Sequence, residues 1–539
     1  MASNMDIMTA STGTLSVLLG LAGVLIYLLK SLLYTKSTQN VPLPPGPPPK
    51  AIIGNLRDLP SPGEKDWVHW LKHKDLYGPL SSITIFGQTI VIINDARMAF
   101  DLLEKRSNIY SSRPRMVFAG EMIGWEDILA MQAYGDPFRA YRKAMHKVLG
   151  TKNSIAQFNT LQEVEVRRLL LRVLETPGDL VRHIRTETGA VILKIAYGYN
   201  INPRGPDPLV SLANEALENF SVAGTPGVWI VDAVPILKYL PSWLPGAGFK
   251  RTAAKWRNNL ITTIEKPYLL VQRQMKEGNY PDSYLSNLLK EARGGTLTAE
   301  EEKVIEWSAG SLYTGGADTT VSTLSTFFLA MSLYPGIQKE AQQELDAVLG
   351  PATLPTFADR PKLPYIEALV KEALRWHPVA PMGIPHMCTQ DDIYEGSRIP
   401  RGAIVMANIW AFTHDAKVYP NPEVFDPDRF LSFTGKEPQP DPHNLTFGFG
   451  RRICPGRILA DSTIFMSIAQ ALAVFDIRPQ EDESGKDSVR AEFLPGVISH
   501  PVPFKLKITP RSKEHEELVR RIEVEVPFGE GDAETLKDV

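Results

Sequence analysis

The residue best placed for chemistry is Cys454, one of only two cysteines in a chain of 539 residues. It lies in a glycine-rich segment, 447–456, and an apolar, helix-like run, 458–472, follows it directly. Glycines let a backbone turn tightly, and the free N–H groups at a helix N-terminus favour a thiolate. Such a thiolate can be a metal ligand. The alternative is an inert, buried cysteine in a turn.

The loop around Cys454 resembles the Phe-x-x-Gly-x-Arg-x-Cys-x-Gly signature of the cytochrome P450 family. All five fixed positions match: Phe447, Gly450, Arg452, Cys454 and Gly456. The resemblance implies that the Cys454 sulfur is the axial ligand of a heme b iron, a bond that favours O–O cleavage. It also implies that Phe447, Gly448 and Gly456 bind the heme. The Arg452 cation could neutralise a heme propionate.

A second candidate site lies in the segment 302–333, which is predicted to form one long helix. A pair of glycines, 315–316, interrupts it, and each costs about 1 kcal/mol relative to alanine. The functional interpretation is that they clear space above the iron, with Thr319 offering a hydroxyl to bound oxygen and Asp318 bringing protons. The alternative is a simple kink with a polar flank. The segment is similar to the family's acid–alcohol element, so Asp318 and Thr319 are the predicted catalytic residues.

Heme propionates need cationic partners. Phe138, Arg142 and Met145 share one helical face, and a charge in an apolar stripe suggests a buried anionic partner. The family usually has tryptophan where this chain has Phe138. His386 resembles a second propionate contact of the family.

Glu372 and Arg375 are spaced so that they share one face of a helix. An ordinary surface ion pair is the usual explanation for this spacing. The pair also matches the family's Glu-x-x-Arg motif, whose third partner would be Arg429. The implied role of the three residues is structural.

These residues belong to a chain that is predicted to be mainly α with small β-sheets. Two β-rich runs, 82–86 and 89–93, are expected to form a hairpin, and Asp95 is expected to cap the next helix. The pattern is mostly helical from about 95 to 380, and short strands are expected near 404–406 and 504–508. The resemblance implies the family's helical prism.

The N-terminal part is predicted to be a single-pass membrane anchor. Residues 7–29 carry no charge, and a membrane-spanning helix needs about 20 such residues. A cleaved signal peptide is the alternative. Lys30 and Lys36 follow the run and place the rest of the chain in the cytoplasm, on an endoplasmic reticulum membrane if the resemblance holds. The expected organisation is an anchor (1–30), a stiff proline-rich hinge (31–50), a catalytic domain (51–510) and a charged tail (511–539) that is a surface or disordered end.

By their position relative to the motifs, the substrate walls should include 116–131, 308–314, 379–384 and 496–498. Phe118, Trp125, Leu312 and Tyr313 are among these residues, although many of the residues could be plain core. The apolar composition indicates a lipophilic substrate. The segment 228–249 either dips into the membrane interface or is packed core.

Electrons must come from outside, because the sequence shows no flavin or dinucleotide motif. The family resemblance implies NADPH and a separate NADPH–cytochrome reductase. Arg139, Lys143 and Lys147 form a helical stripe that is either a docking patch for this reductase or a plain solvated face. The net charge of −3 does not support a nucleic-acid partner.

The predicted function is therefore a heme-dependent monooxygenase that inserts one atom of O₂ into a lipophilic small molecule. The chain resembles most the fungal secondary-metabolism members of the family, of the O-methylsterigmatocystin oxidoreductase type. One alternative is a heme-thiolate isomerase or dehydratase that needs no reductase; the intact Asp318–Thr319 pair argues against it. The other is a non-catalytic, ligand-binding membrane protein.

Overall fold

The structure, a computed structural model, describes residues 41–61, 63–225, 228–292, 297–432, 437–481 and 489–538. The predicted anchor at 7–29 lies outside the described residues. The chain divides into two units, of which the smaller contains, among the described residues, 41–44 and 392–399. There β4 (Asp392–Tyr394) pairs antiparallel with β5 (Ser397–Ile399). All the residues discussed below belong to the larger unit.

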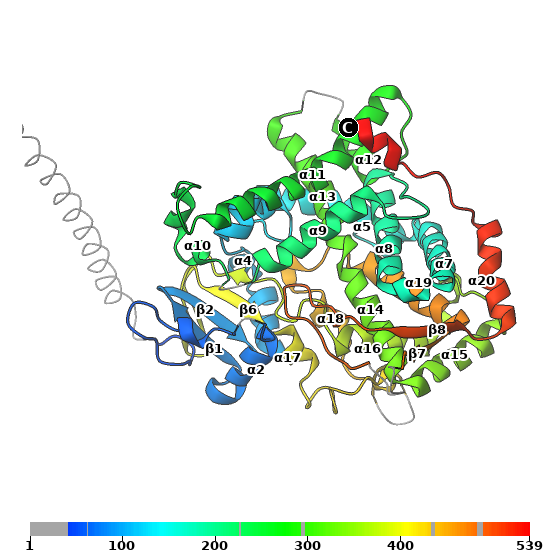
Figure 1. The fold of residues 1–539 in the computed structure, drawn as a ribbon. Helices are drawn as coiled ribbons and strands as arrows, with labels where there is room; N and C mark the ends of the chain where they lie inside the picture. The colour runs from blue at the N-terminus through cyan, green and yellow to red at the C-terminus, as the bar shows by residue number, and fades with distance from the viewer. Residues whose placement is uncertain are drawn as a thin grey trace, which may run out of the picture. The chain divides into compact units, whose positions relative to one another are not determined.

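The larger unit is mainly helical, as predicted (Figure 1). Its helices are α2 (Asp66–Tyr77), α3 (Ala96–Ala99), α4 (Ser107–Tyr110), α5 (Asp136–Leu149), α6 (Lys152–Ala156), α7 (Asn159–Glu175), α8 (Leu180–Tyr197), α9 (Pro208–Ala223), α10 (Ile230–Ala233), α11 (Gly248–Glu277), α12 (Tyr284–Ala292), α13 (Ala299–Ala317), α14 (Thr319–Leu333), α15 (Pro335–Leu349), α16 (Pro364–Trp376), α17 (Ile409–Thr413), α18 (His443–Thr446), α19 (Arg457–Val474) and α20 (Lys513–Glu525). Short 3-10 and π-helical turns connect several of them.

The predicted hairpin is confirmed and belongs to a four-stranded sheet. Strands β1 (Leu80–Ile85) and β2 (Gln88–Ile93) pair antiparallel, β6 (Ile404–Ala407) adds to β2 in parallel, and β3 (His386–Met387) completes the order β1-β2-β6-β3. The Phe86–Gly87 turn has positive φ at both residues, as a two-residue hairpin loop of type I′ requires. The side chain of Asp95 accepts a hydrogen bond from the Met98 N–H and caps α3, as expected. A separate two-stranded sheet joins β7 (Phe475–Pro479) to β8 (Leu506–Pro510).

The long helix predicted over 302–333 is two helices, and this corrects the prediction. Helix α13 starts at Ala299, where Thr298 and Glu301 form a capping box. It ends at Ala317, and α14 starts at Thr319. The residue between them, Asp318, has φ −127° and ψ −27°, which lies outside the helical region. The break lies two residues after the glycine pair at 315–316, in agreement with the low helix propensity of glycine.

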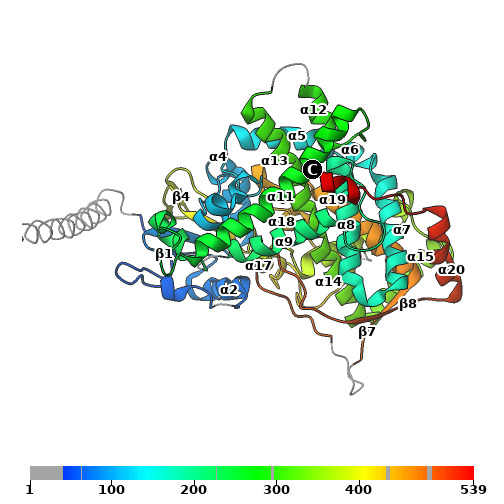
Figure 2. The same cartoon turned by 45° about the horizontal axis from the view of Figure 1, so that its top comes forward.

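Two apolar clusters hold α13 and α14 in place. Side chains of α5, α8, α9, α11 and α13 form one cluster, and side chains of α7, α14, α16 and α19 form the second. In Figures 1 and 2, α7, α8 and α14 lie on the side of this unit away from strands β1 and β2. The helix pair α13–α14 is therefore fixed along its whole length, and so is the break at Asp318.

Helix α19, which follows Cys454, is apolar on all sides. It is the one unbent helix among the described residues that is long and apolar enough to cross a membrane, yet most of its residues are buried within the fold. A helix that is hydrophobic all round is a core helix when other helices surround it. Here α19 packs against α7, α14 and α16, so it anchors the cysteine loop in the core.

Two segments at the ends of the catalytic domain pack against it. The later part of the proline-rich hinge has no helix or strand, as predicted, but it is docked: the Pro45 carbonyl accepts from the Ser82 N–H (2.9 Å). The charged end after residue 510 was predicted to be a surface or disordered segment. It contains the ordered helix α20, whose Val519 and Ile522 are fully buried. Its amphipathic pattern explains the packing, because the charges cover only one face.

Candidate active site

The cysteine loop folds back on itself between α18 and α19. The Cys454 N–H donates to the Phe447 carbonyl (2.8 Å), and both Gly448 and Gly450 have positive φ. A side chain at Gly450 would meet the Leu103 carbonyl oxygen at 2.5 Å. The glycines of the motif are therefore required both for the turn and for its close packing.

Opposing effects act on the Cys454 thiol. Burial raises its pKa, while the Gly456 N–H and the positive charges of Arg142 and Arg457 act in the opposite direction. The predicted stabilisation of a thiolate by the helix terminus is present, but burial outweighs it. A bound metal cation would add the positive charge that deprotonates such a thiol.

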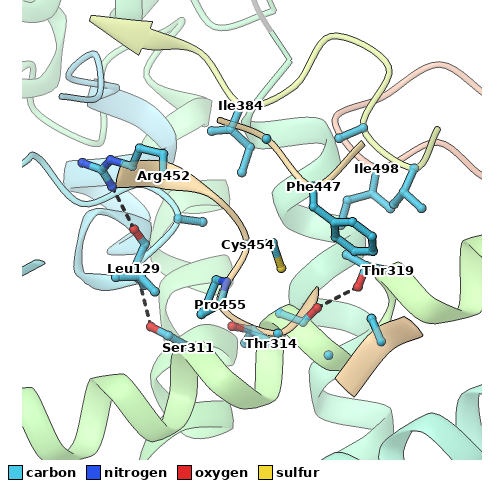
Figure 3. A pocket seen from close by; sticks show the side chains of 18 of the residues that line it. Leu129, Ser311, Thr314, Thr319, Ile384, Phe447, Arg452, Cys454, Pro455 and Ile498 are labelled. Carbon is cyan, nitrogen blue, oxygen red and sulfur yellow. Dashed lines mark hydrogen bonds between the residues drawn. The ribbon is translucent and has the colours of Figure 1, made fainter. Parts of the chain in front are cut away.

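Cys454 faces a cavity of about 360 Å³ that lies between the cysteine loop and the α13–α14 pair. Figure 3 shows the sulfur projecting into this space, with Thr314 and Thr319 from the helix pair and Ile384 and Ile498 from two loops around it. The cavity wall is mostly apolar. Each of the four predicted wall segments contributes to it, although only in part.

Two of the aromatic residues predicted in the walls belong to the core. Phe118 stacks on Trp229 with ring centroids 3.6 Å apart, and the Tyr313 hydroxyl donates to the Leu209 carbonyl (2.7 Å). Trp125 and Leu312 do line the cavity. The sequence alone cannot distinguish the core residues Phe118 and Tyr313 from the wall residues Trp125 and Leu312, because pocket walls and cores have the same composition.

Three arginines line the cavity near the cysteine loop: Arg113, Arg142 and Arg452. The Arg452 guanidinium lies over the Phe138 ring (3.8 Å) and donates to the carbonyls of Ser111 (2.6 Å), Gln132 (2.6 Å) and Leu129 (3.3 Å, Figure 3). Burial lowers its pKa to about 9. Arg142 Nη1 donates to the Ile453 carbonyl (2.7 Å), so it braces the cysteine loop directly.

Arg113 was missed by the sequence reasoning. It is 7% exposed, and it donates to the carbonyls of Ala130, Ile384 and Pro385. Its neighbour Arg115 is exposed and pairs with Glu121 instead. In the sequence both are arginines beside Pro114, so only the fold distinguishes the cavity residue from the surface residue.

His386 lines the cavity, as predicted, but in a neutral state. Burial lowers its pKa well below the usual value, and the nearby Arg113 charge acts in the same direction. Its Nδ1 must donate to the Tyr110 carbonyl (2.7 Å), because a carbonyl only accepts. The other ring nitrogen, Nε2, is then an acceptor. It can donate to a propionate only after the propionate has induced protonation of the ring.

Asp318 and Thr319 lie on different sides of the helix break. Thr319 lines the cavity, and its hydroxyl donates to the Gly315 carbonyl (2.8 Å, Figure 3). Asp318 does not line the cavity; its carboxylate accepts from His500 Nε2 (2.9 Å). Although burial acts to raise the pKa of Asp318, the hydrogen bond from His500 and the charges of His500 and Arg185 hold it below its usual value.

The two glycines of the break serve different purposes. A Cβ at Gly315 would meet no atom within 4 Å, whereas a Cβ at Gly316 would meet Ile192 of α8 at 2.8 Å. Gly315 therefore leaves room in the cavity, as predicted for the pair. Gly316 is needed for the packing of α13 on α8.

Glu372, Arg375 and Arg429 form a buried ionic triad. Arg375 donates to both carboxylate oxygens of Glu372 (2.7 and 2.8 Å), and Arg429 donates to the same carboxylate (3.3 Å). The side chains of Glu372 and Arg375 have no exposed surface, and that of Arg429 is 2% exposed. The surface-pair alternative is wrong. Because the triad does not line the cavity, its role is structural.

The residues present fit a heme. No carboxylate stands among the cavity-lining residues in the part of the chain that the structure describes, so the charges of Arg113, Arg142 and Arg452 are uncompensated there. Buried cations without an anion are costly, and heme brings two carboxylates. Its flat apolar ring matches the cavity wall, and the Cys454 sulfur offers an axial ligand.

Comparison with known proteins agrees with this site. The model of the family described as cytochrome P450 matches residues 44–508. The chain is 48% identical to cytochrome P450 monooxygenase claR of Ampulloclitocybe clavipes, over 93% of this chain and 91% of that protein. It is 43% identical to O-methylsterigmatocystin oxidoreductase of Aspergillus flavus, over 95% and 96% of the two chains. The chain therefore belongs to the cytochrome P450 family, and it is a monooxygenase of the fungal secondary-metabolism type.

Proposed function

We propose that this monooxygenase inserts one oxygen atom of O₂ into a C–H or C=C bond of a lipophilic, uncharged organic molecule. The observation that carries the proposal is the distribution of charge in the cavity. The three arginines lie near the cysteine loop, where they would meet the propionates of a heme. Among the described residues, the remaining wall is mostly apolar and without an acidic or basic side chain other than His386, with Trp125, Phe220 and Val497 among its members. A charged substrate would find no partner on that wall.

The heme would be held by the Cys454 sulfur as axial ligand, with Phe447, Gly448 and Gly456 against the ring. Arg113, Arg142 and Arg452 would neutralise the propionates, and His386 would add a contact once protonated. When bound, the heme supplies the activation of O₂ that no side chain can perform. This assignment is supported by the uncompensated arginines and by the match of the cysteine loop to the family signature.

Asp318 and Thr319 would handle protons. The Thr319 hydroxyl is one of three threonine hydroxyls that α14 brings to the cavity wall, with Thr320 and Thr323, and it is the one next to Asp318; it can pass a proton there by exchanging its bond to Gly315. The Asp318 carboxylate, one residue away and outside the cavity, can receive protons from the solvent side. Proton transfer by a positioned side chain is the general means of acid catalysis in enzymes.

Electrons would come from NADPH through a separate reductase. Arg139, Lys143 and Lys147 of α5 are exposed, so they can take part in docking. Arg139 pairs with Asp136, and Lys147 pairs with Glu291 (2.6 Å). Lys143 is thus the stripe residue for which the described residues show no ion pair, and it would lead the contact with an acidic partner.

The segment 228–249 would face the membrane and support delivery of the lipophilic substrate. In 228–249, Ile236, Tyr239 and Trp243 are 71%, 75% and 79% exposed. Large apolar side chains gathered on a surface mark a protein or membrane contact. We therefore favour the interface interpretation over packed core for this segment, with the N-terminal anchor holding the enzyme on the endoplasmic reticulum membrane.

The test begins with the absorption spectrum of the reduced, carbon-monoxide-bound protein. We expect the long-wavelength band of thiolate-ligated heme. Cys454→Ser should abolish it together with NADPH-dependent turnover. Cys388→Ser is the matched control and should keep both, because Cys388 is buried and its thiol donates to the Gln390 carbonyl. If the wild-type protein binds no heme, the proposal fails.

Reductase-supported NADPH consumption then separates the alternatives. A monooxygenase consumes NADPH and O₂ with the reductase and forms an oxygenated product. The isomerase or dehydratase alternative predicts turnover of a peroxide without reductase. The ligand-binding alternative predicts neither activity. Membranes that contain the protein, fed with candidate metabolites and examined by mass spectrometry, would identify the substrate.

A further inference from the structure

The Asp318 carboxylate has a partner from a distant part of the chain. His500 Nε2 donates to Asp318 Oδ2 (2.9 Å) across 182 positions of sequence. Arg185 of α8 lies farther away, with 3.8 Å between its Nη2 and Asp318 Oδ1, and it also pairs with Glu218 (3.6 Å). His500 therefore makes the shorter of the two contacts to this acid.

Hydrogen bonds of the residues around His500 fix the position of its loop. The neighbouring Ser499 donates its N–H to the Val379 carbonyl (2.8 Å), and its carbonyl accepts from the Ser322 hydroxyl on α14 (2.5 Å). The His500 carbonyl accepts from the Leu494 N–H (2.8 Å). These bonds tie the loop to α14, one turn after Asp318, and to Val379 in the cavity wall. The backbone from which the imidazole reaches the carboxylate is thus fixed on both sides.

The acid needs such a partner because of where it lies. Its side chain is only 12% exposed, and a buried carboxylate is costly without donors. Asp318 also stands at the break between two helices, so helical backbone geometry does not fix its side chain. If His500 were absent, Arg185 would be the remaining cation near Asp318 among the described residues. It would draw the carboxylate toward α8, away from Thr319.

We propose that His500 is a positioning residue, whose hydrogen bond holds the Asp318 carboxylate at the α13–α14 junction within reach of Thr319 and keeps it from closing on Arg185. His500 itself touches neither the cavity nor the reacting atoms. The inference rests on the proposed proton-handling role of Asp318 and Thr319. The His500 side chain is 21% exposed, so His500 also connects the Asp318 carboxylate to solvent.

Three substitutions separate the hydrogen bond from the loop. His500→Gln keeps an N–H close to the position of Nε2, but its amide cannot titrate. His500→Asn is polar but too short to reach Oδ2, and His500→Leu removes the donor altogether. If positioning is the role, His500→Gln should keep the wild-type rate of NADPH oxidation, and the other two variants should share one defect. If His500→Leu folds poorly, the comparison of His500→Gln with His500→Asn decides the question alone.

The first readout does not depend on turnover. The infrared carboxyl band of Asp318 can be identified as the band that is missing in Asp318→Asn. In His500→Leu and His500→Asn this carboxyl should protonate at a higher pH than in the wild type, because a hydrogen bond to the charged form lowers a carboxyl pKa. In His500→Gln the hydrogen bond is kept, so the pKa of Asp318 should rise less than in the other two variants.

The second readout is NADPH oxidation by the heme-loaded full-length protein with reductase, without an added organic substrate. A general acid contributes about 10²- to 10⁴-fold, so misplacement of Asp318 should slow this rate by about tenfold or more and increase its solvent deuterium isotope effect. In an Asp318→Asn background, His500→Leu should have no further effect. A slower rate that persists in that background would mean a general loop defect and would overturn the inference.

The spectrum of the reduced, carbon-monoxide-bound protein keeps this test separate from that of the proposed function. A wild-type protein without the thiolate band refutes the proposed function. Wild-type and variant proteins that all show this band, with the same Asp318 titration and the same rates, refute the role of His500 alone.

Discussion

Single side chains decide how the cavity is charged. Arg113 and Arg142 make hydrogen bonds only to backbone carbonyls in the contacts described above, and Arg452 adds a ring contact with Phe138. A carbonyl satisfies an N–H but not a positive charge. The charge of each arginine is therefore available to a ligand, and this distribution suits a dianionic, otherwise apolar cofactor.

Arg113 and Arg115 provide a matched pair of substitutions that tests whether a cavity arginine binds the cofactor. Arg113→Gln should weaken heme retention by about tenfold, since a hydrogen bond to a charged group contributes about 1.5 kcal/mol or more. Arg115→Gln should have no effect on heme, because Arg115 is exposed and bonded to Glu121. Heme transfer to apomyoglobin measures both. Equal rates of transfer from the two variants would contradict the propionate role of Arg113.

At the level of elements, the break between α13 and α14 links packing to chemistry. Gly316 allows α13 to approach α8, and Gly315 faces open space. The loop that contains His500 then reaches Asp318 at the same break. Beside the cysteine loop, α18 and α19 are joined through His443, which binds Asp441 (2.6 Å) and Asp461 (3.1 Å) and stacks on Phe447.

The two glycines of the break should respond differently to the same substitution. Gly316→Ala should lower stability by about 1–3 kcal/mol, because the new Cβ would meet Ile192 in a packed core. Gly315→Ala should leave stability unchanged or raise it by up to about 1 kcal/mol, while it weakens the binding of ligands in the cavity. The thermal midpoint of heme release and carbon monoxide affinity report the two effects. A destabilised Gly315→Ala protein would show that the open space is not real.

The His443 clamp predicts a pH dependence near the cysteine loop. Although burial acts to lower it, the hydrogen bonds to Asp441 and Asp461 raise the pKa of His443 to about 9, above the ordinary value of 6.5. The clamp therefore stabilises the fold fully below about pH 6.5, and its contribution is lost as the pH rises through about 9. In His443→Gln this part of the pH dependence should disappear. Thermal midpoints of unfolding, measured between pH 6 and pH 10, test this prediction, and His146→Gln, at an exposed histidine, is the control. Identical pH profiles for the wild type and His443→Gln would exclude the clamp.

On the scale of the whole molecule, the apolar segment 228–249 and the predicted anchor would act together at a membrane. Ile236, Tyr239 and Trp243 present apolar surface that the described fold does not cover. The cavity behind the cysteine loop is the place where a lipophilic molecule would end its path. A membrane contact at this segment would bring the substrate from the bilayer without passage through water.

A truncated protein that begins at residue 41 should still bind phospholipid vesicles, although more weakly than the full chain. Replacement of Ile236, Tyr239 and Trp243 by serine in the truncated protein should abolish the remaining binding, while the heme spectrum stays the same. Cosedimentation with vesicles measures both steps. Unchanged sedimentation after the triple replacement would assign the contact to another surface.

The sequence by itself determined the features that depend on neighbours in the chain. The hairpin within 82–93, the cap at Asp95, the glycine loop around Cys454 and the spacing of Glu372 and Arg375 are all local, although the hairpin turn lies at Phe86–Gly87, one residue before the position that the predicted strands leave for it. Each follows from backbone geometry over a few residues, so the residue types and their spacing are enough to recognise it. The mainly helical class followed from periodicity in the same way.

Only the tertiary structure decided which polar groups meet across long distances. It buried Arg113 and exposed Arg115, made His386 neutral, broke the helix at Asp318 and brought His500 to that acid. Burial and long-range pairing depend on how all the helices pack, and no short window of sequence contains that information. A charge acquires its pKa and its partner only when the surrounding chain has excluded the water.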